Sequence, residues 1–269
     1  MGFKIKFESV FRPRFCAANP STFDLPRSGT RPPKLNCWIA VILSIAIIRV
    51  LAAEGAAPTA AFGKRLYTDN FHGGLVQWVV EQQPGGTVTT QNGRLVIEDV
   101  AGCTVWFRSK LTAPVVITYT ATVAAKPRVS DLNCFWMATD PARPGDLFAP
   151  GHKRDGRFAT YDSLRTYYVG YGGNDNTTTR FRRYAGDGTR PLLPEHDLKA
   201  PAVLLKPDHA HKITLIVIGG RVQFLRDGTV IFDFRDPQPL TEGWFGFRTV
   251  QSRIEIRDFV VREAKPIRR

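Results

Sequence analysis

The sequence is poor in cysteine, and its cysteines are not arranged to bind a metal. Four cysteines occur in 269 residues, with no Cys-x-x-Cys pair and no cluster with histidine, which excludes a zinc-finger type of structural site. No stretch of a dozen residues after the N-terminal region has an apolar period of 3.6 residues, so a helical bundle is also excluded.

Motifs typical of nucleic-acid binding are missing too, although the net charge is +13. Residues 1–53 carry eight Lys and Arg against two acidic residues, a net of +6, which leaves +7 for the rest of the chain. That remainder is spread along the sequence, as on an ordinary solvated surface. We therefore expect no nucleic-acid partner.

The N-terminal region has the layout of a signal peptide. The apolar run Trp38–Ile48 follows basic residues, is cut by Arg49, and precedes the small residues Ala52 and Ala53. Eleven apolar residues are fewer than the ~20 that a membrane span needs, although an uncleaved anchor remains the alternative. We expect the mature chain to start near Glu54, to be secreted or periplasmic, and to keep no stable membrane span. The predicted organisation is a leader (1–53), a linker (54–64), one domain (65–263) and a tail (264–269).

The predicted domain consists of short strands separated by turns. Val115–Val123 is rich in β-branched residues, and the dipeptides Asn92-Gly93, Gly219-Gly220 and Asp227-Gly228 favour tight hairpins. The stretch 141–157 has no strand signal and is long enough to be a functional loop. Together these features predict an all-β fold, an antiparallel two-sheet jelly-roll sandwich, which we expect to be a monomer.

Cys103 and Cys134 remain in the mature chain. Two thiols in an oxidising compartment can pair, but both lie in apolar strand-like segments, where a free cysteine behaves as a small hydrophobic residue. The sequence leaves both alternatives open.

Several motifs carry a resemblance to known families. The opening Tyr67–Phe71 (YTDNF) and the closing Ile254–Val260 (IEIRDFV) resemble concanavalin A-like lectin/glucanase jelly rolls. Ser130–Asp140, Tyr167–Asn174 and Gly243–Arg248 resemble a bacterial family of unknown function, similar to YesU-type proteins found among rhamnogalacturonan-utilisation genes. The resemblance covers about residues 65–263 and implies a secreted jelly roll that works on plant or algal polysaccharide. It supplies no established catalytic residues.

One motif of the glucanase branch is absent. That branch carries E-x-D-x-x-E on one strand, which presents two carboxylates on the same face. Here Glu255 and Asp258 are three residues apart without a partner at the right spacing, so retaining glucanase chemistry is not expected at this position.

The stretch 162–197 holds the densest polar and aromatic chemistry. Strand alternation directs Arg180, Arg182 and Tyr184 to one face and Phe181 to the other. Arginine forks match the carboxylates of uronic acids, and tyrosine rings stack on sugars. The alternative is a solvated strand with cross-strand ion pairs. The predicted catalytic residues are His196, Tyr168, Arg180, Arg182 and Glu195, and the predicted substrate-binding residues are Trp136, Asn133, His152, Tyr171, Asn174, Tyr184 and Arg248.

No cofactor is predicted. Gly172–Thr177 is a turn-forming run that offers oxygen ligands but lacks the ordered spacing of a calcium loop, so a structural calcium is left open. His209 and His211 are expected in a turn at the surface, and a metal there would need further ligands.

Three functions fit these observations. The first is a lyase or glycoside hydrolase acting on acidic plant-type polysaccharide. The second is a non-catalytic carbohydrate-binding module, and the third is a structural envelope protein without a ligand. In the first two, the partner is a polysaccharide or oligosaccharide.

Overall fold

The computed structural model describes residues 57–267. The predicted leader and the first residues of the predicted linker lie outside this range. Within the range, no helix has the length and hydropathy that crossing a membrane requires.

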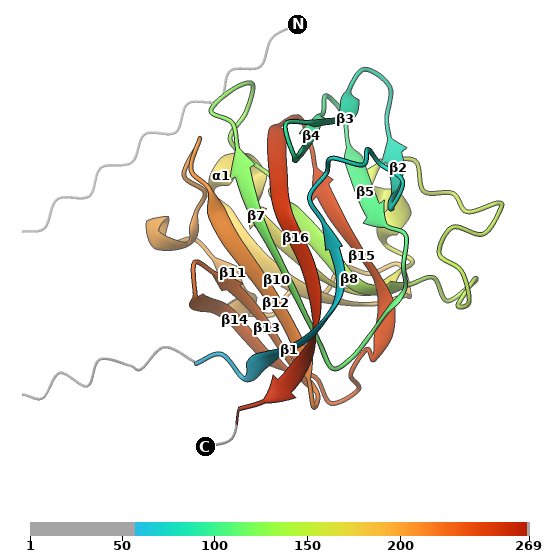
Figure 1. Cartoon of the computed structure of the whole chain (residues 1–269), viewed down its shortest axis with the longest axis vertical. Helices are drawn as coiled ribbons and strands as arrows, with labels where there is room; N and C mark the ends of the chain where they lie inside the picture. Colours follow the sequence, from blue (N-terminus) through green and yellow to red (C-terminus); the bar gives the residue numbers. More distant parts are fainter. Residues whose placement is uncertain (1–56, 268–269) are drawn as a thin grey trace, which may run out of the picture. The chain divides into compact units, whose positions relative to one another are not determined.

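The fold consists of two antiparallel sheets packed face to face (Figure 1). The first sheet has the order β14-β13-β12-β7-β16-β4-β3, with β1 paired to β16. Its strands are β1 (Ala60–Asp69), β3 (Thr87–Gln91), β4 (Arg94–Glu98), β7 (Val115–Val123), β12 (His211–Ile218), β13 (Arg221–Arg226), β14 (Thr229–Arg235) and β16 (Arg253–Pro266).

The second sheet has the order β11-β10-β9-β8-β15-β5-β2, with β6 paired to β15. Its strands are β2 (Trp78–Gln82), β5 (Cys103–Phe107), β6 (Leu111–Thr112), β8 (Asn133–Thr139), β9 (Arg165–Gly172), β10 (Thr178–Ala185), β11 (Asp197–Leu198) and β15 (Glu242–Thr249). Short helical turns are η1 (Phe158–Tyr161), α1 (Gly173–Asn176), η2 (Pro194–His196) and η3 (Pro201–Val203). The predicted two-sheet sandwich is confirmed.

Side chains that strand alternation directs inward fill the space between the two sheets. In β7 the side chains of Val115, Ile117 and Tyr119 point into the main core, and Phe181 does so from β10. Burying an apolar side chain of this size contributes roughly 1.5–3 kcal/mol, so the core residues of both sheets hold the layers together.

The three predicted hairpin turns join β3 to β4, β12 to β13 and β13 to β14. Asn92 and Gly93 have φ values of 49° and 71°, and Asp227 and Gly228 have φ values of 51° and 81°. Positive φ at both central residues is what a type I′ hairpin requires, and Asn, Asp and Gly tolerate it best.

Cys103 and Cys134 are both free and buried, so they do not form a disulfide. Burial raises the pKa of the Cys134 thiol to about 12. Both residues therefore pack as small hydrophobic groups.

Two paired strands reach beyond residues 65–263. β1 begins at Ala60, inside the stretch predicted as a linker, because it pairs with β16, which runs on to Pro266. Residues 141–157 form no strand, as predicted, and belong to the long connection between β8 and β9. This connection is the yellow-green loop at the side of the sandwich in Figure 1.

Candidate functional site

Residues 141–164, called the covering segment below, lie over the outer face of the second sheet. Tyr161 of this segment stacks on Phe135 of β8, with ring centroids 5.4 Å apart. The segment closes a second, smaller core on this face, made of Trp106, Phe135, Ala138, Leu147, Tyr161, Leu164, Tyr168, Tyr184 and Trp244. The middle of this face is therefore filled by the protein's own side chains.

Arg154 anchors the covering segment through a buried ionic network. Its Nε lies 3.2 Å from Oε1 of Glu81, and its Nη1 lies 3.5 Å from Oδ2 of Asp140. The exposed fractions of these side chains are 3%, 3% and 9% for Arg154, Glu81 and Asp140. The Nε1 of Trp106 donates to the other oxygen of Glu81 at 2.9 Å. Nδ1 of His152 lies 3.8 Å from Glu81 Oε1, so this predicted binding residue is part of the same network.

A row of polar residues crosses the same sheet beside the second core. Arg248 of β15 lies opposite Thr104 on one side and Asn133 on the other. Arg248 is only 1% exposed. Its guanidinium donates to Thr104 Oγ1 and to the carbonyl of Gly156 at 3.0 Å each, and lies 4.8 Å from the ring centre of Phe158. Arg248 thus contacts Gly156 and Phe158 of the covering segment as well as its neighbouring strands.

Buried polar atoms without a hydrogen-bond partner concentrate on this face. Within residues 57–267 four of the six such atoms belong to this face, namely Asn133 Oδ1, His152 Nδ1, Tyr184 OH and Arg248 Nε. The other two are Trp136 Nε1 and Thr249 Oγ1. Buried polar groups usually find partners, so this cluster distinguishes the face from the rest of the sandwich.

The strand alternation predicted for β10 is observed. Phe181 packs in the core between the sheets, whereas Tyr184 packs in the second core on the outside. Arg180 forms a two-pronged ion pair with Asp197, with its nearer bond at 2.7 Å, and this bond lowers the pKa of Asp197. Arg182 donates to the carbonyl of Arg190, and no described carboxylate lies within ion-pair distance of it.

The predicted site residues do not meet in one place. Tyr168, Arg180, Arg182, Tyr184, Asn133 and Arg248 belong to the outer face of the second sheet, and Trp136, Tyr171 and His196 lie on its inner side. The aromatic candidates Trp136, Tyr168, Tyr171 and Tyr184 are all buried, so they do not form an exposed stacking platform.

His196 is buried with its ring edge-on to Phe181, at 4.9 Å between centroids. Burial lowers the pKa of His196, which keeps the ring neutral at neutral pH. Glu195 beside it is exposed, because the two residues lie in the short helical turn η2. Asn174, a predicted binding residue, lies elsewhere, in the β9–β10 turn, where its Nδ2 donates to Thr178 Oγ1 at 3.3 Å. The five predicted catalytic residues are thus divided between two sides of the sheet.

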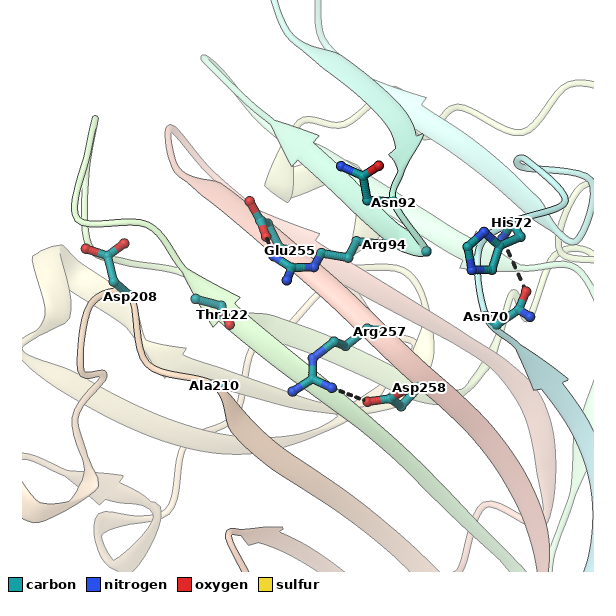
Figure 2. Close-up of a pocket in the computed structure, with 11 residues that line it drawn as sticks. Asn70, His72, Asn92, Arg94, Thr122, Asp208, Ala210, Glu255, Arg257 and Asp258 are labelled. Atoms are coloured by element: carbon teal, nitrogen blue, oxygen red, sulfur yellow. Dashed lines mark hydrogen bonds and ion pairs between the residues drawn. The ribbon is translucent and has the colours of Figure 1, made fainter.

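A polar pocket of about 500 Å³ lies on the outer face of the first sheet, away from the stretch that the sequence favoured (Figure 2). Its floor comes from β4, β7 and β16, and loops before β12 and after β1 form two of its walls. The lining residues are Asn70, His72, Asn92, Gly93, Arg94, Thr122, Asp208, Ala210, Glu255, Arg257 and Asp258.

Two ion pairs cross the floor of the polar pocket. Arg94 Nη1 lies 2.6 Å from Glu255 Oε2, and Arg257 Nη1 lies 2.8 Å from Asp258 Oδ2 (Figure 2). A hydrogen bond from Arg253 lowers the pKa of Glu255 further, so this carboxylate is ionised at neutral pH. The pocket therefore presents both charges together with neutral amides and a hydroxyl.

Sequence reasoning missed this pocket, although one signal for it was present. Alternation along Arg253–Arg257 directs Glu255 and Arg257 to the solvent side of β16. The loop residues Asn70, His72 and Asp208 gave no such signal, because only the fold brings them beside β16.

The expectation that His211 lies at the surface is wrong. His211 starts β12, is buried, and has its Nδ1 3.2 Å from Oδ2 of Asp227. Burial lowers the pKa of His211 despite this carboxylate. Its ring is edge-on to Tyr171, which explains the burial, whereas His209 is exposed as expected.

Comparison with known proteins identifies the fold and the family. No curated protein matches the chain in sequence. A protein of unknown function with a galectin-like fold from Bacillus subtilis is 22% identical, with a TM-score of 0.63, and the match covers 77% of this chain and 100% of the other. A carbohydrate-binding module, CBM66, from Bacillus subtilis is 10% identical with a TM-score of 0.50, covering 70% and 96%.

A variant of LamA from Z. galactanivorans, in complex with laminaritriose and laminaritetraose, is 12% identical with a TM-score of 0.51, covering 76% and 100%. These likenesses establish a galectin-like, concanavalin-like sandwich, and the relationship to YesU-type proteins stays a prediction. A family model matches residues 97–259, more than half of the chain, and the protein therefore belongs to the family described as a domain of unknown function, DUF6250.

Proposed function

We propose that this protein is a carbohydrate-binding protein and that the polar pocket of the first sheet is its saccharide site. The fold supports this proposal, because solved structures that share it include a carbohydrate-binding module and a protein in complex with oligosaccharides. The observation that carries it is the pocket itself, about 500 Å³ in volume and lined almost entirely by polar side chains.

The size and lining of the pocket suit a sugar. Ligand sites of small molecules commonly span about 300–1,000 Å³. Most such sites are apolar, whereas this one offers the amides of Asn70 and Asn92, the ring of His72 and the hydroxyl of Thr122. A ligand must be rich in hydroxyl groups to satisfy so many donors and acceptors at once.

One arginine of the pocket, Arg257, is available to an acidic sugar. Arg257 is half-exposed, and among residues 57–267 its ion-pair partner is only its chain neighbour Asp258, which is itself exposed. An exposed ion pair of this kind contributes about 0–1 kcal/mol, so Arg257 can exchange it for a ligand carboxylate at little cost. Its planar fork then matches a uronate in two-pronged geometry.

The predicted catalytic residues of the second sheet are placed to stabilise the fold and not to transfer protons. Arg180 lowers the pKa of Asp197, which makes this carboxylate a poor general acid. Burial raises the pKa of Tyr184 to about 12 and that of Tyr168 well above its usual value, so neither phenol supplies a base at neutral pH. His196 has its ring packed against Phe181, on the inner side of the sheet. Binding without turnover is therefore the function that we favour.

The proposed setting is outside the cytoplasm. It follows from the apolar run Trp38–Ile48 and the small residues after it, which have the layout of a cleaved signal peptide. For a secreted or periplasmic protein, the ligand that we propose is plant-type acidic polysaccharide, rhamnogalacturonan included.

Affinity gels of immobilised glycans test the proposal. We expect retention on polygalacturonate or rhamnogalacturonan and passage through a gel of neutral β-glucan. Arg257→Ala should weaken retention about tenfold or more, since a hydrogen bond to a charged group is worth about 1.5–3 kcal/mol. Arg182→Ala, on the second sheet, is the matched control and should be retained like the wild type.

Three results would count against the proposal. Absence of retention on every acidic glycan would refute binding. Loss of retention in Arg182→Ala but not in Arg257→Ala would move the site to the second sheet. New reducing ends or unsaturated products after incubation would replace a binding protein with a hydrolase or a lyase.

A further inference from the structure

Three side chains that can ligate a metal converge where β12 begins. His209 and His211 flank Ala210, and Asp227 occupies the β13–β14 turn next to them. One ligand atom from each of the three lies within 4.8 Å of the other two.

The backbone holds two of these ligands in position. The amide of Lys212 donates to Asp227 Oδ1 at 2.8 Å, and the amide of Asp227 donates to the carbonyl of Lys212 at 2.8 Å. The second carboxylate oxygen, Oδ2, is thereby directed at His211 Nδ1, 3.2 Å away. Two tetrahedral ligands of zinc, each about 2.0–2.1 Å from the ion, are themselves separated by about 3.3 Å.

The third ligand is able to adjust. His209 is exposed, and its ring centroid lies 4.7 Å from that of His211. A change of its side-chain rotamer is sufficient to bring a ring nitrogen to an ion held by His211 and Asp227. Exposed side chains make such changes freely.

We infer that His209, His211 and Asp227 form a binding site for one transition-metal ion of the zinc type. Two imidazoles and one carboxylate suit Zn²⁺, Co²⁺, Ni²⁺ or Cu²⁺, whereas Ca²⁺ takes six to eight oxygen ligands. The fourth position of a tetrahedral ion is left for water.

Binding requires a defined rearrangement of one proton. The ion takes the place of the proton shared by His211 Nδ1 and Asp227, and the neutral ring then carries its proton on Nε2. The amide of Lys206 now points at Nε2 from 3.4 Å, a long hydrogen bond, and has to turn aside. Arg226 Nε lies 3.7 Å from Asp227 Oδ2 and competes with the ion for this oxygen.

The site adjoins the polar pocket. Asp208 and Ala210, the chain neighbours of His209, both line that pocket. An ion bound by His209 would hold this wall of the pocket in place and strengthen glycan retention. This consequence rests on the proposed function, whereas the metal site does not.

Calorimetric titration of the full chain with Zn²⁺ tests the site. We expect one ion per chain, no binding of Ca²⁺, and about a tenfold or greater loss of affinity in His209→Ala and in Asp227→Asn. His152→Ala is the matched control, because it removes a partly exposed histidine elsewhere. Arg226→Gln should tighten binding, because the competing cation is gone.

The outcomes separate the site from its alternatives. Wild-type affinity in both His209→Ala and Asp227→Asn, or an equal loss in His152→Ala, overturns the inference. A thiolate charge-transfer band in the Co²⁺ complex also overturns it, because the ion would then be bound by cysteine. Zinc binding without any change in glycan retention leaves the site intact and removes only its link to the pocket.

Discussion

Arg154 ties the covering segment to the second sheet, and its removal gives the clearest measure of how that segment is held. Its guanidinium lies between Glu81 and Asp140 and also donates to the carbonyl of Leu147. Arg154→Ala leaves the buried Glu81 without its arginine and leaves Asp140 with only the partly exposed Arg143. Breaking a buried ion pair from one side costs about 3–5 kcal/mol, a large share of the 5–15 kcal/mol that stabilises a typical domain.

The matched control is Arg143→Ala. Arg143 lies 3.6 Å from the same carboxylate of Asp140, but its side chain is about one-third exposed. A pair of this kind is worth about 0–1 kcal/mol, so the control separates burial from charge. The structure thus predicts a difference of about 2–5 kcal/mol between two arginine variants that share one partner.

Urea unfolding and limited proteolysis measure the effect. With a slope of about 2–3 kcal/mol per molar urea, a loss of about 3–5 kcal/mol should lower the midpoint of Arg154→Ala by roughly 1–2.5 M. Trypsin should cut the variant faster after Lys153 or Arg157, within the covering segment. Equal midpoints for Arg154→Ala and Arg143→Ala would refute the reasoning.

Other expectations follow from the burial of single residues. Burial lowers the pKa of His196 in the folded protein, so unfolding takes up a proton below about pH 6.5. The contribution of His196 to the free energy of unfolding should therefore be complete above about pH 6.5 and fall as the pH is lowered. His196→Leu should reduce this pH dependence, and His72→Leu is the control. Gly93 has a φ of 71°, and an added Cβ would lie 2.9 Å from the His72 ring. Gly93→Ala should therefore lower the free energy of unfolding by about 1–2 kcal/mol, measured in urea. An unchanged urea midpoint would contradict this account. In a variant lacking the two N-terminal cysteines, Cys103 and Cys134 should react with a thiol reagent only after unfolding, and fast labelling of the native protein would show that the sandwich opens.

Local chemistry made the sandwich and its hairpins predictable. Asn92-Gly93 and Asp227-Gly228 tolerate the positive φ that a two-residue hairpin needs, whatever surrounds them. Alternation separated Phe181 from Tyr184, because successive side chains of a strand point to opposite faces. These features depend on neighbours within a few residues, and the sequence contains that information directly.

Alternation within a strand did not predict which segments of the chain cover each face of the two sheets. Alternation directed Tyr184 away from the main core but carried no information on the covering segment, which buries it. It also could not place His211, which is buried because Tyr171 of the other sheet packs on it. An outward direction is a local property, whereas exposure depends on every segment that folds back over the strand.

The polar pocket and the metal site show the same limit most clearly. Alternation alone brings Glu255 and Arg257 to one side of β16, but His72 and Asp208 reach them only through the pairing of distant strands. Likewise Asp227 meets His211 because the β13–β14 turn closes beside the start of β12. The sequence by itself determined the strands, the turns and the sides of each strand, and only the tertiary structure decided which sides are covered and which distant residues share a site, because those depend on long-range contacts.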